Sequence, residues 1–324
     1  MSITAPLEDS TTDLAASRSR AGLRSLLPSL SPKLIAGLAI SGVIVLWGVI
    51  GPLLVGDPNA ISTDAFAPPG GAHLLGTTQT GQDVWTQVTV GVRGSLIIGF
   101  TVGVLSTVLS ALFGVVGAYL GGYVDDAVAL FTNVVLVIPG LPLVIVIGNY
   151  VPVSQRGLLL IALVLAITSW AGSARVLRSV TLSLRNRDYV AASRVAGEKT
   201  WRILVVEILP NLVPVMASQF VFAVIFAILG EAGLSFLGIG ASGTFTLGTI
   251  LFQAYNALAL TQGAWWWFVP PGLVIALFGA GLTLINFAID EIINPKLRVA
   301  TRSARKSWSL SNDQIAKLEK ENAR

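Results

Sequence analysis

Long stretches without a charged residue constrain this chain more than any other feature of its sequence. The stretch from Gly94 to Val124, for example, contains no Asp, Glu, Lys or Arg. About 20 apolar residues of helix are enough to cross the hydrocarbon core of a bilayer. Only 12% of the 324 residues are charged and 53% are hydrophobic, whereas soluble globular proteins carry about 25% charged residues. The pattern predicts an all-α membrane protein and argues against a soluble enzyme.

Six apolar windows predict six transmembrane helices, because a helix satisfies its backbone polar groups internally, as hydrocarbon requires. The windows are residues 34–55, 95–120, 127–150, 157–174, 208–230 and 267–289. We therefore expect one membrane domain over residues 31–298, preceded by a flexible arm at 1–30 and followed by a charged tail at 299–324. The apolar but interrupted stretch 247–260 is too short to span and is expected to form a helix lying against the bundle.

The distribution of Lys and Arg predicts the orientation. The N-terminal arm, the loop after the fourth span and the C-terminal tail hold 19 of the 21 basic residues, and only Arg93 and Arg156 lie elsewhere. Cytoplasmic segments of membrane proteins are enriched in Lys and Arg. Both termini are therefore expected in the cytoplasm, and the loops 56–92 and 236–264 outside. The net charge of +4 then reflects topology, and nucleic-acid binding is not expected.

The predicted cytoplasmic loop 178–210 contains two helical segments separated by a glycine. Residues 189–196 are rich in helix formers, and Gly197 can take the left-handed conformation that ends a helix. Thr200 can cap a second helix, which meets the fifth span at Pro210. This pattern predicts a bent helix pair that projects from the bundle and docks on another protein.

The loop resembles the EAA loop of permease subunits of ABC importers. The residues that carry this resemblance are Ala191, Ala192, Gly197, Leu209 and Pro210, while Val190 stands where the family pattern has glutamate. Two further stretches, 75–96 and 231–240, resemble the OppC/DppC-like branch of peptide and nickel permeases. In the first of them Asp83, Gly91, Arg93 and Ser95 match.

The resemblance implies a six-helix MetI-like fold of the type I importers and a place in a bacterial inner-membrane complex. It implies a homologous second permease (OppB/DppB-like), two ABC ATPase subunits or one fused pair, and an extracytoplasmic solute-binding protein. ATP and Mg would be held by the ATPases, so no cofactor and no metal is expected in this chain. The implied cargo is a short peptide, with nickel or another small peptide-like solute as the alternative. The implied ATPase-coupling residues are Tyr189, Val190, Ala191, Ala192, Arg194, Gly197, Leu209 and Pro210.

Glu231 and Asn133 are the candidate pathway residues. Acids inside a membrane are costly and usually face a cavity or a partner. Glu231 could meet the ammonium group of a peptide, or it could be a hydrogen-bonded anchor for the turn at Gly233 and Gly238; the anchor is favoured. An ion-coupled secondary transporter would need several intramembrane acids and inverted repeats, and Glu231 is the only firm candidate. A membrane enzyme would need a nucleophile, metal or base cluster, and none is visible.

Three further expectations concern packing. Trp265, Trp266 and Trp267 are expected to form an interfacial aromatic belt, with stacking on substrate as the alternative. His73 is expected to be solvated in its loop. The glycines along the second span are expected to allow close helix packing, with a gating hinge as the alternative; they are Gly99, Gly103, Gly114, Gly117 and Gly121.

Overall fold

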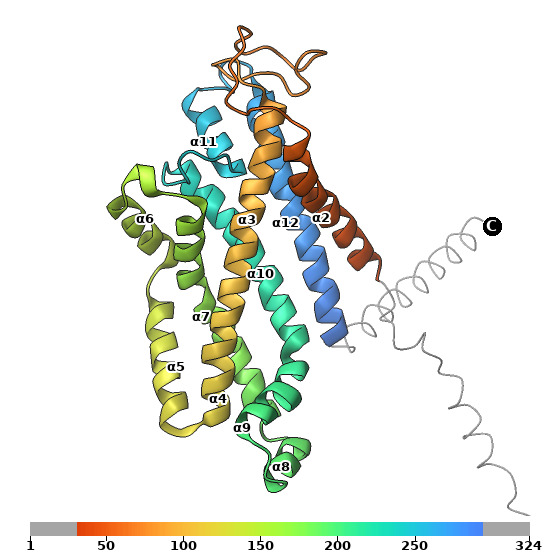
Figure 1. Cartoon of the computed structure of the whole chain (residues 1–324), viewed down its shortest axis with the longest axis vertical. Helices are drawn as coiled ribbons and strands as arrows, with labels where there is room; N and C mark the ends of the chain where they lie inside the picture. The colour runs from red at the N-terminus through yellow and green to blue at the C-terminus, as the bar shows by residue number, and fades with distance from the viewer. Residues whose placement is uncertain (1–30, 294–324) are drawn as a thin grey trace, which may run out of the picture.

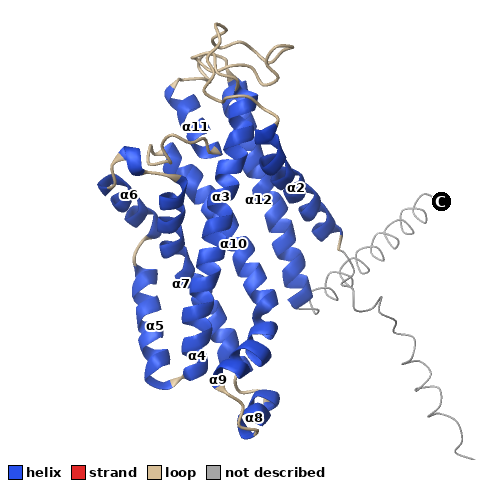
Figure 2. Cartoon of the chain, viewed as in Figure 1, coloured by secondary structure: helices blue, strands red, loops and turns tan. Residues whose placement is uncertain are grey.

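The computed structural model describes residues 31–293, and this part of the chain consists of helices and loops with only two isolated β-bridges (Figure 2). The predicted all-α class is confirmed. The long helices run lengthwise through an elongated bundle (Figure 1). One end carries α8 (Asp188–Val195) and is called the α8 end. The other end carries the loop 54–83 and α11 (Leu247–Asn256) and is called the loop end.

Within the described residues, five helical segments are long and apolar enough to cross a membrane. They coincide with the predicted first, second, fourth, fifth and sixth spans. They are α2 (Pro32–Ile50), α3 (Val84–Ser110), α7 (Leu158–Leu184), α10 (Leu209–Phe236) and α12 (Trp265–Ile293). A π-helical turn at Ala111–Val116 and α4 (Gly117–Leu120) prolong α3. Likewise, α9 (Thr200–Arg202) and a π-helical turn at Ile203–Ile208 lead into α10.

The predicted third span, 127–150, is not a single helix. It consists of α5 (Gly122–Val137) and α6 (Gly140–Tyr150), with a break at Ile138 and Pro139. Ile138 has a ψ of 120°, as expected because proline disfavours the α conformation in the residue before it. Both short helices pack against α7, and together they carry the chain from the α8 end back toward the loop end (Figure 1). The chain crosses here as two short helices, so the predicted number of six transmembrane helices is not confirmed.

Two predicted loops are shorter than expected because the adjoining helices extend beyond the uncharged windows. The Asp83 carboxylate accepts a hydrogen bond from the Thr86 amide at 2.8 Å and starts α3 there. Residues 84–92 therefore belong to α3 and not to the loop predicted at 56–92. At the other end, α7 continues to Leu184, so Arg178 belongs to a helix and the loop predicted at 178–210 begins only after it.

The loop 54–83 is pinned to the bundle by side chains that were expected to be exposed. His73 Nδ1 lies 2.9 Å from Asp83 Oδ2, and its side chain is only 19% exposed. Trp266 is 8% and Trp267 3% exposed, and Trp266 Nε1 donates to the Thr77 carbonyl at 3.2 Å. The aromatic belt is therefore wrong for two of the three tryptophans, and so is the solvated histidine. These residues fasten the loop over the bundle.

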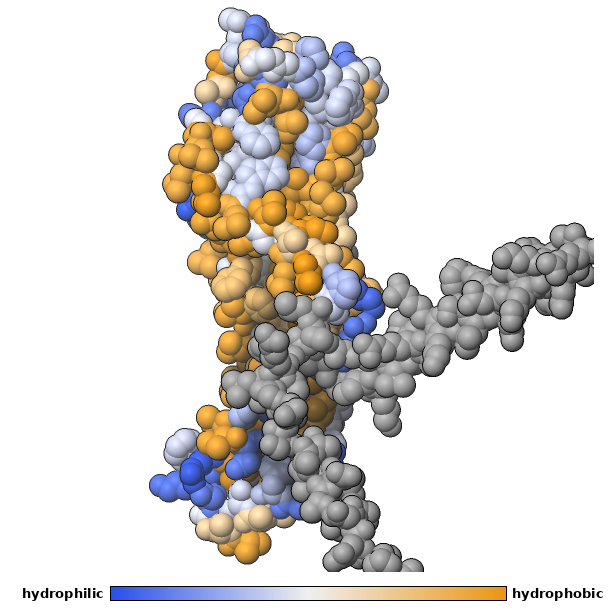
Figure 3. Space-filling view, turned by 90° about the vertical axis from the view of Figure 1, so that its right-hand side faces the viewer, coloured by the Kyte–Doolittle hydropathy of each residue, from blue (hydrophilic) through white to orange (hydrophobic). Residues whose placement is uncertain are grey.

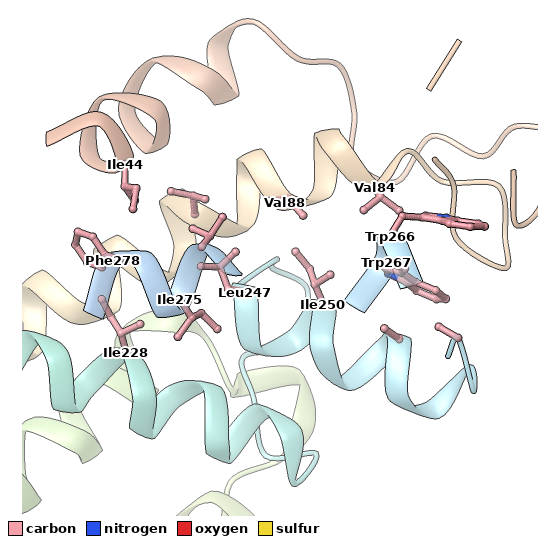
Figure 4. Packing of buried hydrophobic residues seen from close by; sticks show 14 of the residues in the cluster. Ile44, Val84, Val88, Ile228, Leu247, Ile250, Trp266, Trp267, Ile275 and Phe278 are labelled. Atoms are coloured by element: carbon pink, nitrogen blue, oxygen red, sulfur yellow. The ribbon is translucent and has the colours of Figure 1, made fainter. Parts of the chain in front are cut away.

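The main apolar core lies toward the loop end, where α2, α3, α10, α11 and α12 meet (Figure 4). Ile44 of α2, Ile228 of α10 and Phe278 of α12 meet there, and Ile250 brings α11 into the same cluster. The predicted helix at 247–260 thus exists as α11 and packs against the bundle. Its Thr246–Thr249 capping box pairs the first amide groups.

The glycines of the second span allow close packing, as predicted. A Cβ at Gly114 would overlap the Ala174 carbonyl oxygen of α7. A Cβ at Gly99 would likewise overlap the side chain of Ile228 in α10. Larger residues would separate α3 from its two neighbours, which explains why small residues stand at these positions.

Large apolar side chains cover the sides of the bundle. Val43, Phe100 and Phe222 are each exposed, although they lie in the middle of long helices. Figure 3 shows hydrophobic residues over the middle of one face and hydrophilic ones at the α8 end. An exposed apolar belt of this kind is the surface that a bilayer covers, and the chain is a multi-pass membrane protein.

Candidate functional site

A helix–glycine–helix element occupies the tip of the α8 end (Figure 1). Gly197 has a φ of +78°. Its amide donates to the Arg194 carbonyl at 3.0 Å, and the Glu198 amide donates to the Ser193 carbonyl at 3.1 Å. These two bonds define a Schellman motif, which ends a helix with one left-handed residue. The prediction that Gly197 ends this helix in the left-handed conformation is confirmed.

The second helical segment starts differently from the prediction. Lys199 occupies the N-cap position, and Thr200 is already the first helical residue, with no side-chain capping bond. The segment then runs through the π-helical turn directly into α10. Proline has no amide hydrogen and its ring clashes with a carbonyl one turn earlier in a regular helix. The widened turn just before Pro210 accommodates this ring, and Asn211 Nδ2 donates to the Glu207 carbonyl at 2.7 Å in the same place.

One side of α8 is anchored to the bundle. Val190 is fully buried, in a cluster with Tyr119 of α4, Leu177 of α7 and Leu212 of α10. The Arg194 guanidinium lies over the Tyr119 ring, 5.2 Å from its centroid, a cation–π contact. Val190 was predicted to contact the ATPase, but its side chain faces inward. No sequence pattern points to Tyr119, because the contact joins segments far apart in the chain.

The other side of α8 is open to solvent. Ala191, Ala192 and Val195 are exposed, Val195 by 90%. Residues three and four positions apart share one helix face, so these side chains form a small apolar surface at the tip of the molecule. Tyr189 is 39% exposed beside it. Leu209 is half-buried and Pro210 exposed at the base of the loop, so they shape the junction with α10 and lie off the α8 face.

Polar contacts join α5 and α7 near the same end. Arg178 Nε and Nη2 donate to the two oxygens of Asp125 at 2.6 and 2.8 Å, and Asp125 is only 8% exposed. Arg175 Nη2 donates to Asn133 Oδ1 at 2.7 Å. Asn133, a candidate pathway residue, is thus part of a helix-to-helix contact. Asp125 is a second buried acid in a helix, but it lies in the first turn of α5, outside the predicted third span.

Glu231 lies at the opposite end, where α10 meets the start of α11. It is 1% exposed, and its Oε1 accepts hydrogen bonds from Ser235 Oγ and Thr246 Oγ1, both at 2.6 Å. Thr246 caps α11, so the carboxylate ties α11 to α10. The helix continues through Gly233 to Phe236, and the turn follows at Gly238, with a φ of +79°. These contacts describe an anchor.

Comparison with known proteins places the chain in a family. Residues 106–299 match the model of the binding-protein-dependent transport system inner membrane component family. A provisionally named peptide transport system permease of Brucella suis biovar 1 is 37% identical over 270 residues, which are 81% of this chain and 88% of that protein. The dipeptide transport system permease DppC of Bacillus subtilis is 31% identical over 268 residues, 81% of this chain and 82% of its own. The chain belongs to the binding-protein-dependent transport system inner membrane component family.

A solved structure supports the same fold. The match is to inward-facing conformations of the MetNI methionine ABC transporter, with a TM-score of 0.50 and 20% identity over 64% of this chain and 95% of that one. At this identity the match shows the fold. The MetI-like permease fold implied by the sequence is confirmed.

Proposed function

We propose that this chain is one of two permeases of an ATP-driven importer of short peptides, and that α8 is the contact through which separate ATPases drive it. The observation that carries the proposal is the exposed α8 face, held at a fixed angle by the Gly197 motif and by buried Val190. The relatives named as peptide and dipeptide permeases support peptides as the cargo. Nickel or another small peptide-like solute is the alternative cargo.

In this proposal the chain carries out no covalent chemistry and holds no cofactor. ATP and Mg are bound by two ABC ATPase subunits or one fused pair. A solute-binding protein delivers cargo to the loop end, and a homologous second permease completes the pathway. Closure of the ATPases on ATP moves α8 of each permease and switches the bundle between inward-open and outward-open states, a rigid-body transition of the kind common in switching proteins.

The proposed orientation places the α8 end and both termini in the cytoplasm and the chain in a bacterial inner membrane. The basic residues support it, because Arg175, Arg178, Arg185 and Arg187 lie toward the α8 end whereas few lie at the loop end. Tyr189, Ala191, Ala192 and Gly197 are then the residues nearest the ATPase, and Val190 and Arg194 position them from behind.

The test is reconstitution of the four-component complex with its binding protein in liposomes. We expect ATP-dependent accumulation of labelled di- and tripeptides, and no accumulation when the ATPases are left out. Nickel uptake without peptide uptake would favour the alternative cargo. Accumulation by the isolated chain under a proton or sodium gradient would refute the proposal in favour of a secondary transporter.

A further inference from the structure

A cavity of about 340 Å³ lies at the loop end, between α11, the connector of α6 and α7, and the segment that joins α10 to α11. Its size falls within the range of small-ligand sites. Polar groups of Asn59, Ser242 and Gln253 line it, together with the rings of Phe245 and Phe252. A site with mixed polar and aromatic walls suits a small amphipathic ligand.

Arg156 is the one charged residue among those that line this cavity. It is only 9% exposed, and arginine is almost never buried without a partner. Among the described residues, the only hydrogen bond of its side chain runs from Nε to the Val151 carbonyl at 3.0 Å. This bond fixes the base of the guanidinium and leaves the two terminal NH₂ groups without a described partner.

No carboxylate of the described part of the chain forms an ion pair with Arg156. The nearest acid in sequence to a lining residue is Asp57, whose Oδ1 accepts from the amide and from the side chain of Asn59. The cavity therefore carries an excess positive charge on a residue that is itself only 9% exposed. An anion bound there would restore the charge balance that burial of Arg156 disturbs.

The backbone holds Arg156 in this place. The Ser242 amide donates to the Arg156 carbonyl at 2.8 Å, and Ser242 Oγ donates to the Val153 carbonyl at 2.5 Å. Two bonds between the connector and the α10–α11 segment thus fix the backbone of Arg156, and the bond from Nε to the Val151 carbonyl orients its side chain before any ligand arrives. Such preorganisation lowers the entropic cost of binding.

We propose that this cavity is a carboxylate-binding subsite in which Arg156 receives the C-terminal carboxylate of an incoming peptide. The inference rests on the proposed function. A planar guanidinium binds a carboxylate through two parallel hydrogen bonds, while the amides of Asn59 and Gln253 can pair with the peptide backbone. Phe245 and Phe252 can pack against the side chain of the last residue.

The experiment compares uptake of one labelled tripeptide and of its C-terminal amide by the full complex in liposomes. The kcat/KM ratio of acid to amide is measured for the wild type, Arg156→Gln, Arg156→Lys and the control Gln155→Ala. Gln155 is exposed in the same connector and does not line the cavity. Any preference of the binding protein itself cancels in the comparison between variants, because the same binding protein is used throughout.

We expect Arg156→Gln to lower the ratio by about tenfold, the factor that corresponds to about 1.4 kcal/mol. Arg156→Lys should keep part of the preference, and Gln155→Ala all of it. Equal loss of uptake for both peptides would overturn the inference and indicate that Arg156 pairs with another protein of the complex. An unchanged ratio would overturn it as well. Absence of peptide uptake by the wild type would instead contradict the proposed function.

Low yield of the Arg156→Gln complex would not block the test. The purified wild-type complex without binding protein can be heated with the free-acid peptide or with its amide at equal concentration. A rise in the melting temperature with the free-acid peptide but not with the amide supports the subsite, provided that this rise is smaller or absent in Arg156→Lys. Equal effects of both peptides contradict it.

Discussion

At the scale of single residues, burial separates the residues that are open to solvent on α8 from those that hold the helix in place. Ala191 and Ala192 are exposed on α8, whereas Val190 between them and the bundle is fully buried. A sequence motif suggests one role for Val190, Ala191 and Ala192 because they are adjacent in the chain. Only the packing shows that Val190 anchors the helix whose other face is free.

Gly197 is the residue whose backbone demands are strictest, and we predict that Gly197→Val uncouples the complex. A non-glycine residue at a φ of +78° costs about 1–2 kcal/mol, which the short α8 can relieve only by changing its direction. The variant should insert normally and allow ATP hydrolysis, while peptide uptake in liposomes falls several-fold. The neighbouring Ala196→Val, at a φ of −68°, should transport normally. Full uptake by Gly197→Val would show that the bend is dispensable.

Glu231 allows a test of anchor against pathway. Glu231→Leu removes the acceptor of the Ser235 and Thr246 hydroxyls, and each buried unpaired group costs about 1–3 kcal/mol, so the melting temperature in detergent should fall. Glu231→Gln keeps a carbonyl acceptor, so its melting temperature should fall much less. If the Gln variant is stable but discriminates differently between peptides with free and acetylated amino termini, Glu231 lines the pathway instead.

At the scale of helices, the charge-free windows predicted where the long apolar helices lie, because a helix pairs its own backbone polar groups, as lipid requires. They did not predict where α3 begins or where α7 ends, since α3 starts before its apolar window and α7 continues past its own. Pro139 explains why the helix breaks at Ile138, but a proline can either kink or end a helix. Which of the two occurs depends on packing against α7.

Close packing of α3 on α7 predicts the effect of added volume. Gly114→Ala places a Cβ against the Ala174 carbonyl, and overpacking of this kind costs about 1–3 kcal/mol. The melting temperature and the yield of the purified protein should both fall. Gly172→Ala is the matched control, since Gly172 is an α7 glycine with open space around it. This control should be neutral or slightly stabilising; equal damage by both variants would contradict the packing argument.

At the scale of the whole molecule, contacts between distant segments were beyond the reach of the sequence. The pairing of Asp125 with Arg178 required knowing that α5 and α7 meet. The burial of Trp266 under the loop 54–83 also depends on such a meeting. The fold class, the family and the bend at Gly197 were predictable because each follows from contiguous residues, namely the apolar windows, the family motifs and the loop around Gly197.

The absence of cysteine from the chain makes the orientation directly measurable. Single variants Val195→Cys at the α8 end and Leu74→Cys at the loop end both replace exposed side chains, 90% and 67% exposed. A membrane-impermeant thiol reagent applied to intact cells or spheroplasts should label the Leu74→Cys variant alone. Val195→Cys should react only after the membrane is opened. The reverse pattern would place the α8 end outside and contradict coupling to cytoplasmic ATPases.

The continuity of α9, the π-helical turn and α10 has a mechanical consequence. This helical run extends over 37 residues, Thr200–Phe236, and at 1.5 Å per residue it is about 55 Å long. It starts beside α8 and ends near Glu231, which ties α10 to α11 at the loop end. A tilt of the α9 end is therefore transmitted along one continuous helix to the loop end of the bundle. The π-helical turn before Pro210 is the place where this helix would bend first.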